Sequence, residues 1–470
     1  METTHLFGVN GMNITNAAYI VAAILFIVGL KQLGSPATAR NGNRMSALAM
    51  LVAIVATVVG NDIASWEFIL GGAIVGSAIG AYSARKVQMT SMPQLVAIFN
   101  GFGGAASAVI AAGELIRLID EGEVIAEDVS ITIMASVIVG GVTLTGSFIA
   151  YGKLQGLVPT RPLLLPIRNV INVALLIGMV ASSAWLVIDP SITAFLIAGA
   201  IALALGILVV IPIGGADMPV VIALLNSYSG IAGAATGFVL GNNMLIIAGS
   251  LVGASGLILT RIMTKAMNRS LMNVMLGGFG VEDGASASGD EETRPVTSIQ
   301  AEDAATMLAY AQSVIFVPGY GLAVAQAQHQ VRELADLLKE KGISVRYAIH
   351  PVAGRMPGHM NVLLAEANVP YDELKDLDEI NGEFQRTDVA VVIGANDVTN
   401  PSARTDKSSP IYGMPILNVD QAQSVIMMKR GMSAGFAGVQ NELFFLDTTQ
   451  MLFGDAKDSV EKITAEVKAL

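Results

Sequence analysis

Nine long apolar stretches lie between residues 14 and 264 of this 470-residue chain, and they constrain its fold more than any other feature. Crossing a bilayer core of roughly 30 Å takes about 20 helical residues, and most of the stretches approach that length. Only 14% of the residues are charged, which is low for a water-soluble protein. We expect a polytopic all-α membrane bundle with about nine spans, near residues 14–30, 46–60, 66–84, 93–115, 129–151, 169–188, 191–212, 218–240 and 243–264.

Basic residues between these spans fall on alternate loops. Of the twelve Lys and Arg residues before position 280, eleven lie on one side, among them Lys153 after the fifth span, and Arg117 lies on the other. By the positive-inside rule, this distribution places the N-terminus outside and residues 265–470 in the cytoplasm. The first thirteen residues carry no basic region, so we interpret the first stretch as a retained span and not as a cleaved signal.

Small and polar residues inside the spans indicate how the bundle packs. Glycines cluster at Gly71–Gly80 and Gly101–Gly104, as is typical of closely packed membrane helices. Amides at Asn100 and Asn226 are costly in lipid, so they usually pair or line a water path. Asp217 is the one acid expected on the cytoplasmic side before residue 280. It either caps the eighth span or lies at a mobile junction facing the soluble domain.

Beyond the spans the pattern changes. Residues 1–265 form the predicted transmembrane domain, 266–300 an acidic linker and 301–470 a soluble domain. In the soluble domain, β-branched runs alternate with amphipathic helices, which is typical of a Rossmann-like, doubly wound parallel α/β sheet. Strands are expected at 313–317, 344–349, 389–393, 415–419, 424–428 and 450–453, and helices at 301–310, 321–341, 360–367 and 455–469.

A strand–turn–helix pattern at residues 313–326 (SVIFVPGYGLAVAQ) carries the spacing of a dinucleotide fingerprint. Gly319 would permit the tight turn. Gly321 would let a pyrophosphate approach backbone N–H groups at the start of the helix. The segment therefore predicts a dinucleotide site in the soluble domain.

The second strand of such a fold decides between NAD and NADP, because NAD-specific folds place an acid there. Here the strand ends at His350 without an acid, and an arginine-containing segment, 351–357, follows. Lys429 and Arg430 close another strand beside several glycines and suit a phosphate-rich ligand. These residues favour NADP, although the two cations could also be solvated charges at a strand end.

The sequence excludes several other classes. It has no cysteine, so disulfides and thiolate catalysis are ruled out, and no cluster has metal-ligand spacing. The net charge of −11 argues against nucleic acid as a partner.

Many short strings match a known family over essentially the whole chain. They include AAYIVAAILFIVGL, GGADMPVV, KAMNRS, PGYGLAVAQAQ, HPVAGRMPGHMNVLLAEA, VVIGAND, MKRGM, GFAGVQN and LFGDAK. On these strings the chain resembles the β subunit of the proton-translocating NAD(P) transhydrogenase. The resemblance implies a proton-conducting membrane domain and an NADP(H)-binding domain. It also implies a partner α subunit that holds NAD(H) and brings further spans, a dimer of αβ units, and a bacterial inner membrane.

The family's NADP(H) site can be carried over position by position. It joins the fingerprint glycines Gly319 and Gly321 to Tyr320, Val352, Ala353, Gly354, Arg355, Met356, Pro357, Gly394, Ala395, Asn396, Asp397, Val398, Gly413, Met414, Lys429, Arg430, Gly431, Met432, Ser433, Ala434, Gly435, Phe436, Asp455 and Ala456. The resemblance implies a dinucleotide reversed relative to an ordinary Rossmann fold, a 2′-phosphate on Lys429 and Arg430, and a lid that begins at these residues. Asp397, by its loop position a simple turn residue, would lie near the nicotinamide and act in coupling. Asp217, Asn226 and Asn100 would serve coupling and the proton path.

Two departures from the family pattern affect these expectations. Some members have a histidine at the position of Asn100, regarded as the proton carrier, so here the carrier is either on a companion subunit or is Asn100 with water. Others have Ser and Tyr at the positions of Gly431 and Phe436, which removes one phosphate contact and one lid hydroxyl. The expected function is reversible hydride transfer from NADH to NADP⁺ coupled to inward proton movement. The alternative is a transporter or channel gated by a cytosolic NADP-sensing domain.

Overall fold

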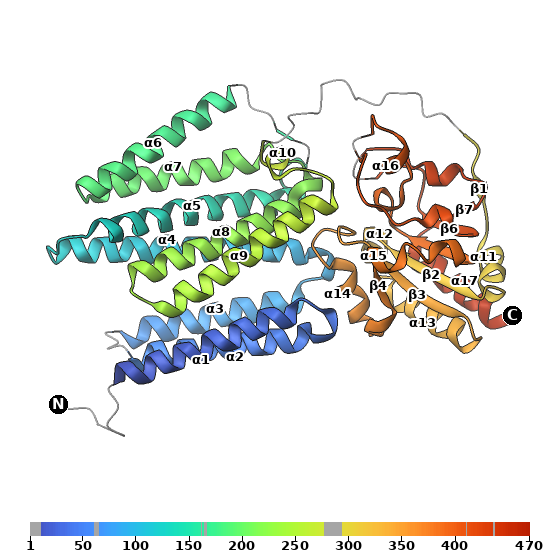
Figure 1. Ribbon diagram of the computed structural model, residues 1–470, viewed down its shortest axis with the longest axis horizontal. Coiled ribbons are helices and arrows are strands. Elements are labelled where there is room, and N and C mark those ends of the chain that lie inside the picture. Colours follow the sequence, from blue (N-terminus) through green and yellow to red (C-terminus); the bar gives the residue numbers. More distant parts are fainter. Residues whose placement is uncertain are drawn as a thin grey trace. The chain divides into compact units, whose positions relative to one another are not determined.

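The computed structural model describes residues 11–60, 65–160, 162–163, 167–276, 294–409, 411–435 and 438–470. The chain divides into two compact units. The first holds the residues up to Thr260, and the second holds those from Arg261 onward, apart from a short segment at 275–277. Figure 1 shows the first unit as a bundle of long helices and the second as a sheet covered by helices.

Nine described helices are long and apolar enough to cross a membrane, and each overlaps one predicted span. They are α1 (Gly11–Leu33), α2 (Pro36–Gly60), α3 (Trp66–Lys86), α4 (Met92–Asp120), α5 (Glu127–Gln155), α6 (Arg168–Ile188), α7 (Ile192–Val210), α8 (Met218–Val239) and α9 (Asn243–Ala266). A short helix, α10 (Leu271–Leu276), follows them. The predicted multi-pass membrane fold is confirmed.

The second span begins ten residues earlier than predicted, at Pro36 and not at 46. The added turns hold polar residues and good helix formers, so hydropathy alone does not find them. They pack closely on α1, because a Cβ at Gly42 would lie 2.7 Å from the carbonyl oxygen of Gly29. Tertiary packing therefore extends this helix beyond its apolar core.

Glycine lets the central helices approach closely. A Cβ at Gly104 on α4 would lie 2.6 Å from the carbonyl oxygen of Gly140 on α5, and one at Gly230 on α8 would lie 2.4 Å from the amide nitrogen of Gly253 on α9. In α3, by contrast, none of the described side chains is buried. A Cβ at Gly76 in that helix would meet no described atom within 4 Å. Small residues thus pack α4, α5, α8 and α9 within the chain, whereas those of α3 face open space.

The second unit contains one parallel seven-stranded sheet, which confirms the predicted doubly wound fold. Its strands are β1 (Thr297–Ser298), β2 (Ser313–Pro318), β3 (Ser344–Ile349), β4 (Leu374–Asp376), β5 (Val389–Ile393), β6 (Ser424–Lys429) and β7 (Thr449–Phe453). The order is β1-β7-β6-β5-β2-β3-β4. Apart from β1, this is the 3-2-1-4-5-6 order of dinucleotide-binding folds, with its switch point between β2 and β5.

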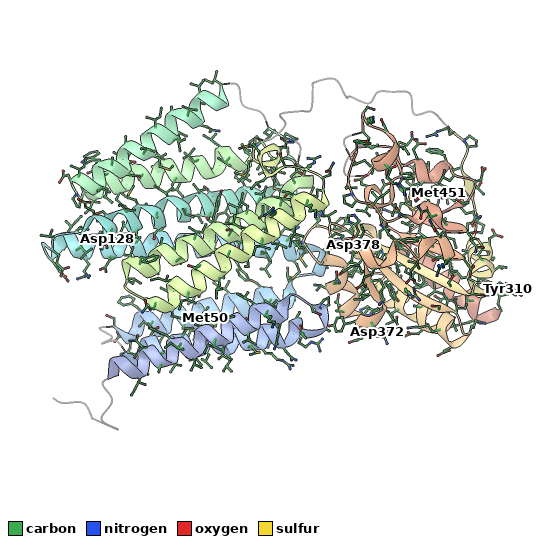
Figure 2. The ribbon with its side chains drawn as sticks, in the orientation of Figure 1. Met50, Asp128, Tyr310, Asp372, Asp378 and Met451 are labelled. Atoms are coloured by element: carbon green, nitrogen blue, oxygen red, sulfur yellow. The ribbon has the colours of Figure 1, made fainter. Side chains whose placement is uncertain are left out.

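Helices cover the sheet, and short helical turns fill several connections. The α-helices are α11 (Ala301–Ala309), α12 (Tyr320–Ala325), α13 (Gln328–Glu340), α14 (His359–Glu366), α15 (Leu377–Ile380), α16 (Ser402–Thr405) and α17 (Ala456–Ala469). The core between these layers is apolar. It includes Val317, Val392, Val425 and Met451, each of which is fully buried. Figure 2 labels Met451 within this unit. It also labels Asp128 of the first unit, an acidic residue in the first turn of α5.

Two elements differ from their predictions. The expected strand at 415–419 is absent, although Leu417 and Val419 are fully buried, because the Asn381 side chain bonds this segment in place of a strand. The Asn381 amide donates to Ile416 O at 2.9 Å, and its oxygen accepts from Asn418 N at 2.9 Å. The expected helix at 321–341 is two helices, broken where Gln326 adopts φ of +50°. The short edge strands β1 and β4 were not predicted, because two or three residues carry no periodic signal.

Candidate functional site

The loops that follow β2 and β5 interlock at the switch point of the sheet. Gly319 N donates to Ile393 O at 2.9 Å, and Gly321 N donates to Gly394 O at 3.0 Å. A Cβ at Gly321 would lie 2.6 Å from Gly394 Cα, and Gly394 itself has φ of +68°. The space beside Gly321, which the sequence assigned to a pyrophosphate, is therefore occupied by the β5 loop. Both glycines are required by backbone packing.

The loop after β3 begins at a buried, neutral histidine. His350 Nε2 lies 2.8 Å from Pro415 O, and its Nδ1 accepts from Val352 N at 3.2 Å. The proton must therefore sit on Nε2, which donates to the carbonyl. Burial lowers the pKa of His350 to about 4, while the bond to Pro415 opposes the shift. This histidine fixes the start of segment 352–357 without carrying charge at neutral pH.

The depressed pKa of His350 predicts a pH-dependent stability. Between about pH 6.5 and about pH 4 the unfolded state binds a proton that the folded state does not, so stability falls as the pH falls through this window. We expect the titration of His350 to lower the free energy of unfolding by on the order of 3 kcal/mol across this pH window. Denaturant unfolding of a fragment of residues 290–470 at pH 7 and pH 4.5 measures the effect. His350→Gln, which keeps a donor and cannot titrate, should flatten the dependence. An unchanged dependence in this variant would contradict the assignment.

Tyr320, Arg355 and His359 gather where the β2 and β3 loops meet. The Arg355 guanidinium lies 4.4 Å from the centre of the Tyr320 ring, and Arg355 N donates to His359 Nδ1 at 3.0 Å. His359 therefore carries its proton on Nε2. Its pKa is lowered, first by burial and then by the Arg355 charge. Within the described residues, the buried Arg355 Nε and His359 Nε2 atoms have no hydrogen-bond partner. Each buried donor left unsatisfied costs about 1–3 kcal/mol, which a bound acceptor would recover.

The end of β6 brings cations beside the β5 loop. Lys429 Nζ donates to Ser433 O at 2.7 Å and lies 4.6 Å from the centre of the Phe444 ring. Its pKa is lowered by burial, and the nearby Asp397 carboxylate opposes this shift. Arg430 is exposed. A Cβ at Gly435 would lie 2.3 Å from Asp397 Oδ1, so the chain after Lys429 passes directly over that carboxylate.

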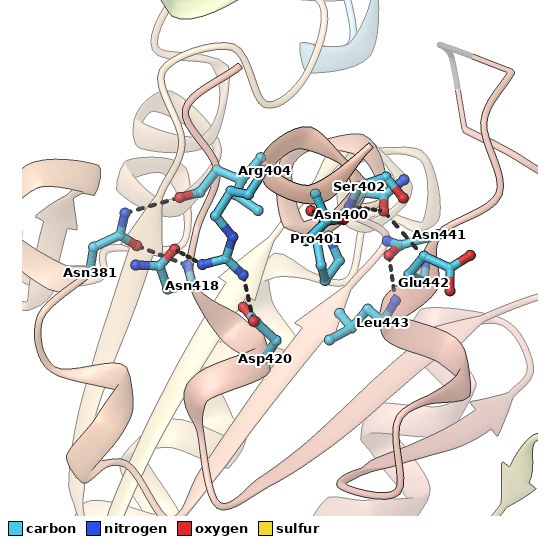
Figure 3. Close-up of polar contacts among 12 residues, drawn as sticks. Asn381, Asn400, Pro401, Ser402, Arg404, Asn418, Asp420, Asn441, Glu442 and Leu443 are labelled. Carbon is cyan, nitrogen blue, oxygen red and sulfur yellow. Dashed lines mark hydrogen bonds and ion pairs between the residues drawn. The ribbon is translucent and has the colours of Figure 1, made fainter. Parts of the chain in front are cut away.

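Asparagines that the sequence did not single out hold the β5 loop. Asn441 Nδ2 donates to both the backbone and side-chain oxygens of Asn396 at 3.0 Å. Asn400 Oδ1 accepts from Ser402 N at 3.1 Å and from Glu442 N at 3.3 Å, as Figure 3 shows. These bonds join segment 396–402 to segment 440–443. Their only sequence signal is an asparagine in each of two loops, which is also typical of ordinary turns.

Three other predicted site residues lie in a turn or at the start of a helix. Gly413 has φ of +78° and packs against Asn268, whose Nδ2 donates to Tyr412 O at 2.7 Å within the second unit. Asp455 caps α17 through its side chain, which accepts from Lys457 N at 2.9 Å, and Ala456 begins that helix. Gly431 faces open space among the described residues. Phe436 lies outside the described residues.

In the first unit, one of the predicted polar residues, Asn100, is bonded to a neighbouring helix through a backbone carbonyl. Asn100 is buried on α4 and its Nδ2 donates to Ile222 O on α8 at 3.3 Å, one turn before Asn226. Asp217 is 8% exposed and accepts no capping bond from α8, because its backbone is helical (φ −90°, ψ −3°) and continues the preceding turn. Lys153, predicted in a loop, lies in the last turn of α5 and is fully buried.

Taken together, the glycine loops of β2 and β5, the buried donors after β3 and the cations at the end of β6 lie at the carboxyl ends of parallel strands. This edge of a doubly wound sheet is where such folds bind their ligands. Within the described part of the chain, no three His, Asp or Glu side chains lie close enough to hold a metal ion.

Comparison with known proteins agrees with this arrangement. Residues 15–466 match the profile of the family described as NAD(P) transhydrogenase beta subunit. Two curated relatives, both from Rhodospirillum rubrum and both named NAD(P) transhydrogenase subunit beta, are 54% identical over 456 residues. The alignment covers 96% of this chain and 98% of each relative.

Proposed function

Because the chain belongs to the NAD(P) transhydrogenase beta subunit family, we propose that its second unit binds NADP(H) and that its helices couple hydride transfer from NADH to inward proton movement. The observation that carries this proposal is the pair Lys429 and Arg430 at the carboxyl end of β6, next to the Asp397 loop. Arginine and lysine in such a position suit the 2′-phosphate that distinguishes NADP from NAD.

The residues present fit a dinucleotide. The buried Arg355 Nε and His359 Nε2 offer two donors to oxygen acceptors, and the pair at β6 offers two cations to a phosphate. The segment after Lys429 closes over Asp397 and would exclude water from the reacting end. When bound, the nicotinamide supplies the hydride chemistry. The protein orients it, keeps the site dry, and places the Asp397 carboxylate where a change in charge reaches Lys429.

For the membrane domain we propose a bacterial inner membrane, with the N-terminus outside and the second unit in the cytoplasm. The support is the asymmetry of Lys and Arg between loops. Asp217 would relay the protonation state of the helices to the NADP(H) domain. The linked pair of Asn100 and the α8 turn before Asn226 would line the proton path, with the carrier supplied by water there or by a companion subunit.

A direct assay tests this function. The purified complex of this chain with its α subunit is mixed with NADH and an NADP analogue whose reduced form absorbs separately. We expect reduction of the analogue by the complex and, in inverted sealed vesicles whose nucleotide domain faces the medium, proton movement out of the lumen. A fragment of residues 290–470 alone should bind NADPH without exchanging hydride. NADP-dependent ion flux without any reduction would instead identify a gated transporter, and hydride exchange by the fragment would contradict the two-subunit assignment.

We further propose that a span of the α subunit packs on α3, within a dimer of αβ units. The names of the relatives imply such a subunit. In α3, Gly72, Gly76 and Gly80 form a stripe, and a Cβ built on any of the three would have no described atom within 4 Å. A stripe of this spacing allows two membrane helices to approach closely.

The open stripe on α3 predicts a specific assembly defect. Gly76→Leu meets nothing within this chain, so the chain should accumulate in the membrane normally. Co-purification with the α subunit should fall severalfold, because the leucine blocks close approach of the partner helix. Val75→Leu on the same helix, whose side chain is already exposed, is the matched control. Wild-type recovery of the α subunit with Gly76→Leu would exclude α3 as its docking helix.

A further inference from the structure

A fully buried lysine lies at one end of the helical bundle. Lys153, in the last turn of α5, has no exposed surface, and its Nζ donates to Ile213 O at 2.8 Å. A buried ammonium is costly unless it is paired and hydrogen-bonded, and an ionisable residue in a membrane helix is a functional candidate for that reason. Lys86, in the last turn of α3, is exposed, so burial is not a general property of lysines at helix ends here.

The carbonyl that Lys153 holds belongs to the residue directly before the Asp217 loop. That loop runs from Gly214 to a short 3₁₀ turn, Gly215–Asp217, in which Asp217 N donates to Gly214 O at 3.1 Å. Among the described residues, two bonds tie this loop to α5 and the chain that follows it, one from the Lys153 side chain to Ile213 O and one from Gly215 N to Thr160 O at 2.9 Å. The backbone of the Asp217 loop is therefore anchored to α5 and the residues after it, and the Asp217 side chain makes no capping bond to α8.

The same turn of α5 is also bonded to α4. Gln94 is buried in the first turn of α4, and its Nε2 donates to Leu154 O at 3.4 Å. Further along, Asn100 on α4 donates to Ile222 O on α8. The two side chains of α4 thus bond carbonyls at the end of α5 and in α8, and the Lys153 side chain of α5 bonds the carbonyl just before the Asp217 loop. Lys153 thus connects α5 directly to the residue that precedes the Asp217 loop.

We propose that Lys153 is a positioning residue for proton-coupled hydride transfer and acts by fixing the Asp217 loop. This inference rests on the proposed function and deepens it, because it assigns a second charged group to the coupling path. Lys153 does not touch a dinucleotide in this scheme. It keeps the carboxylate of Asp217 in one place while the protonation state of the helices changes.

The test uses the complex with the α subunit in sealed vesicles, with NADH and an NADP analogue as substrates. Lys153→Met keeps the length and apolar character of the side chain and removes the donor. We expect turnover and proton movement out of the lumen to fall together by about tenfold or more, while KM for the analogue changes by less than about threefold. Lys86→Met, at the matching position of α3, should retain wild-type turnover. Lys153→Gln, which retains a donor, should recover part of the loss.

A double variant separates positioning from simple support of the fold. If Lys153 acts through Asp217, Lys153→Met combined with Asp217→Asn should be no slower than Asp217→Asn alone. Multiplication of the two losses would overturn the proposal, as would wild-type turnover of Lys153→Met. Poor accumulation of both Lys153 variants, with normal turnover per assembled complex, would overturn it in favour of a purely structural role. A wild-type complex that reduces no analogue would instead contradict the proposed function itself.

Discussion

Replacing Lys429 and Arg430 together with alanine is expected to weaken NADPH binding by on the order of a hundredfold or more. A hydrogen bond to a charged group contributes about 1.5–3 kcal/mol, and the double change would remove the two or more such bonds that we propose to the 2′-phosphate. Weak binding of NADH to the same domain should stay nearly unchanged, because NADH lacks that phosphate. Titration calorimetry of the fragment of residues 290–470 with each dinucleotide measures both affinities.

A matched control accounts for the loss of two positive charges. Lys341→Ala combined with Lys462→Ala removes two exposed lysines from the same domain and should leave NADPH affinity within about twofold of wild type, because exposed, distant charges are screened by salt. Equal weakening of NADPH and NADH by the Lys429 and Arg430 variant would show that the pair does not bind the 2′-phosphate. Arg430 is exposed and Lys429 is half-buried, so neither replacement leaves a large cavity.

The second large effect is expected from Asp217→Asn. We predict a complex that assembles and binds NADPH normally but loses most proton-coupled transhydrogenation. Asparagine caps helices about as well as aspartate, so a capping role would survive the change. The structure already weakens that role, because the Asp217 side chain accepts no capping bond from α8. Turnover and proton movement out of inverted sealed vesicles are the measurements.

Asp189→Asn provides the comparison for this variant. Asp189 is an exposed acid at the end of α6, in another loop of the same helical unit. Its replacement should leave turnover unchanged, because an exposed charge is well solvated. Wild-type proton movement in Asp217→Asn would remove this residue from the coupling path and leave it as a loop residue.

Features of the fold that depend on local sequence were predictable. The strand at 313–318 and its glycine turn follow from a short apolar run and fixed spacing, and the order of spans follows from hydropathy. The strand predicted at 415–419 was wrong because a side chain, Asn381, supplies the bonds that a neighbouring strand would otherwise make. The sequence of segment 415–419 does not show that the Asn381 side chain takes the place of a strand partner.

Features that depend on contacts between distant segments could not be predicted. Lys153 was placed in a loop because charge usually ends a span, yet α5 continues and buries it against Ile213. The link from Asn441 to Asn396 joins loops after different strands, and each asparagine alone is an ordinary turn residue. Gly321 matched a fingerprint whose usual reason is ligand approach, whereas here Gly394 lies against it.

The contact between Gly321 and Gly394 also constrains how this domain can change over evolutionary time and during turnover. A Cβ at either glycine would displace the backbone of the other glycine. A replacement at one position therefore cannot be offset by a replacement at the other. Hydrogen bonds from Gly319 N to Ile393 O and from Gly321 N to Gly394 O also join the two loops. If the domain binds a dinucleotide as proposed, its exchange has to involve segments outside this pair, and the chain after Lys429 is a described segment that lies over Asp397.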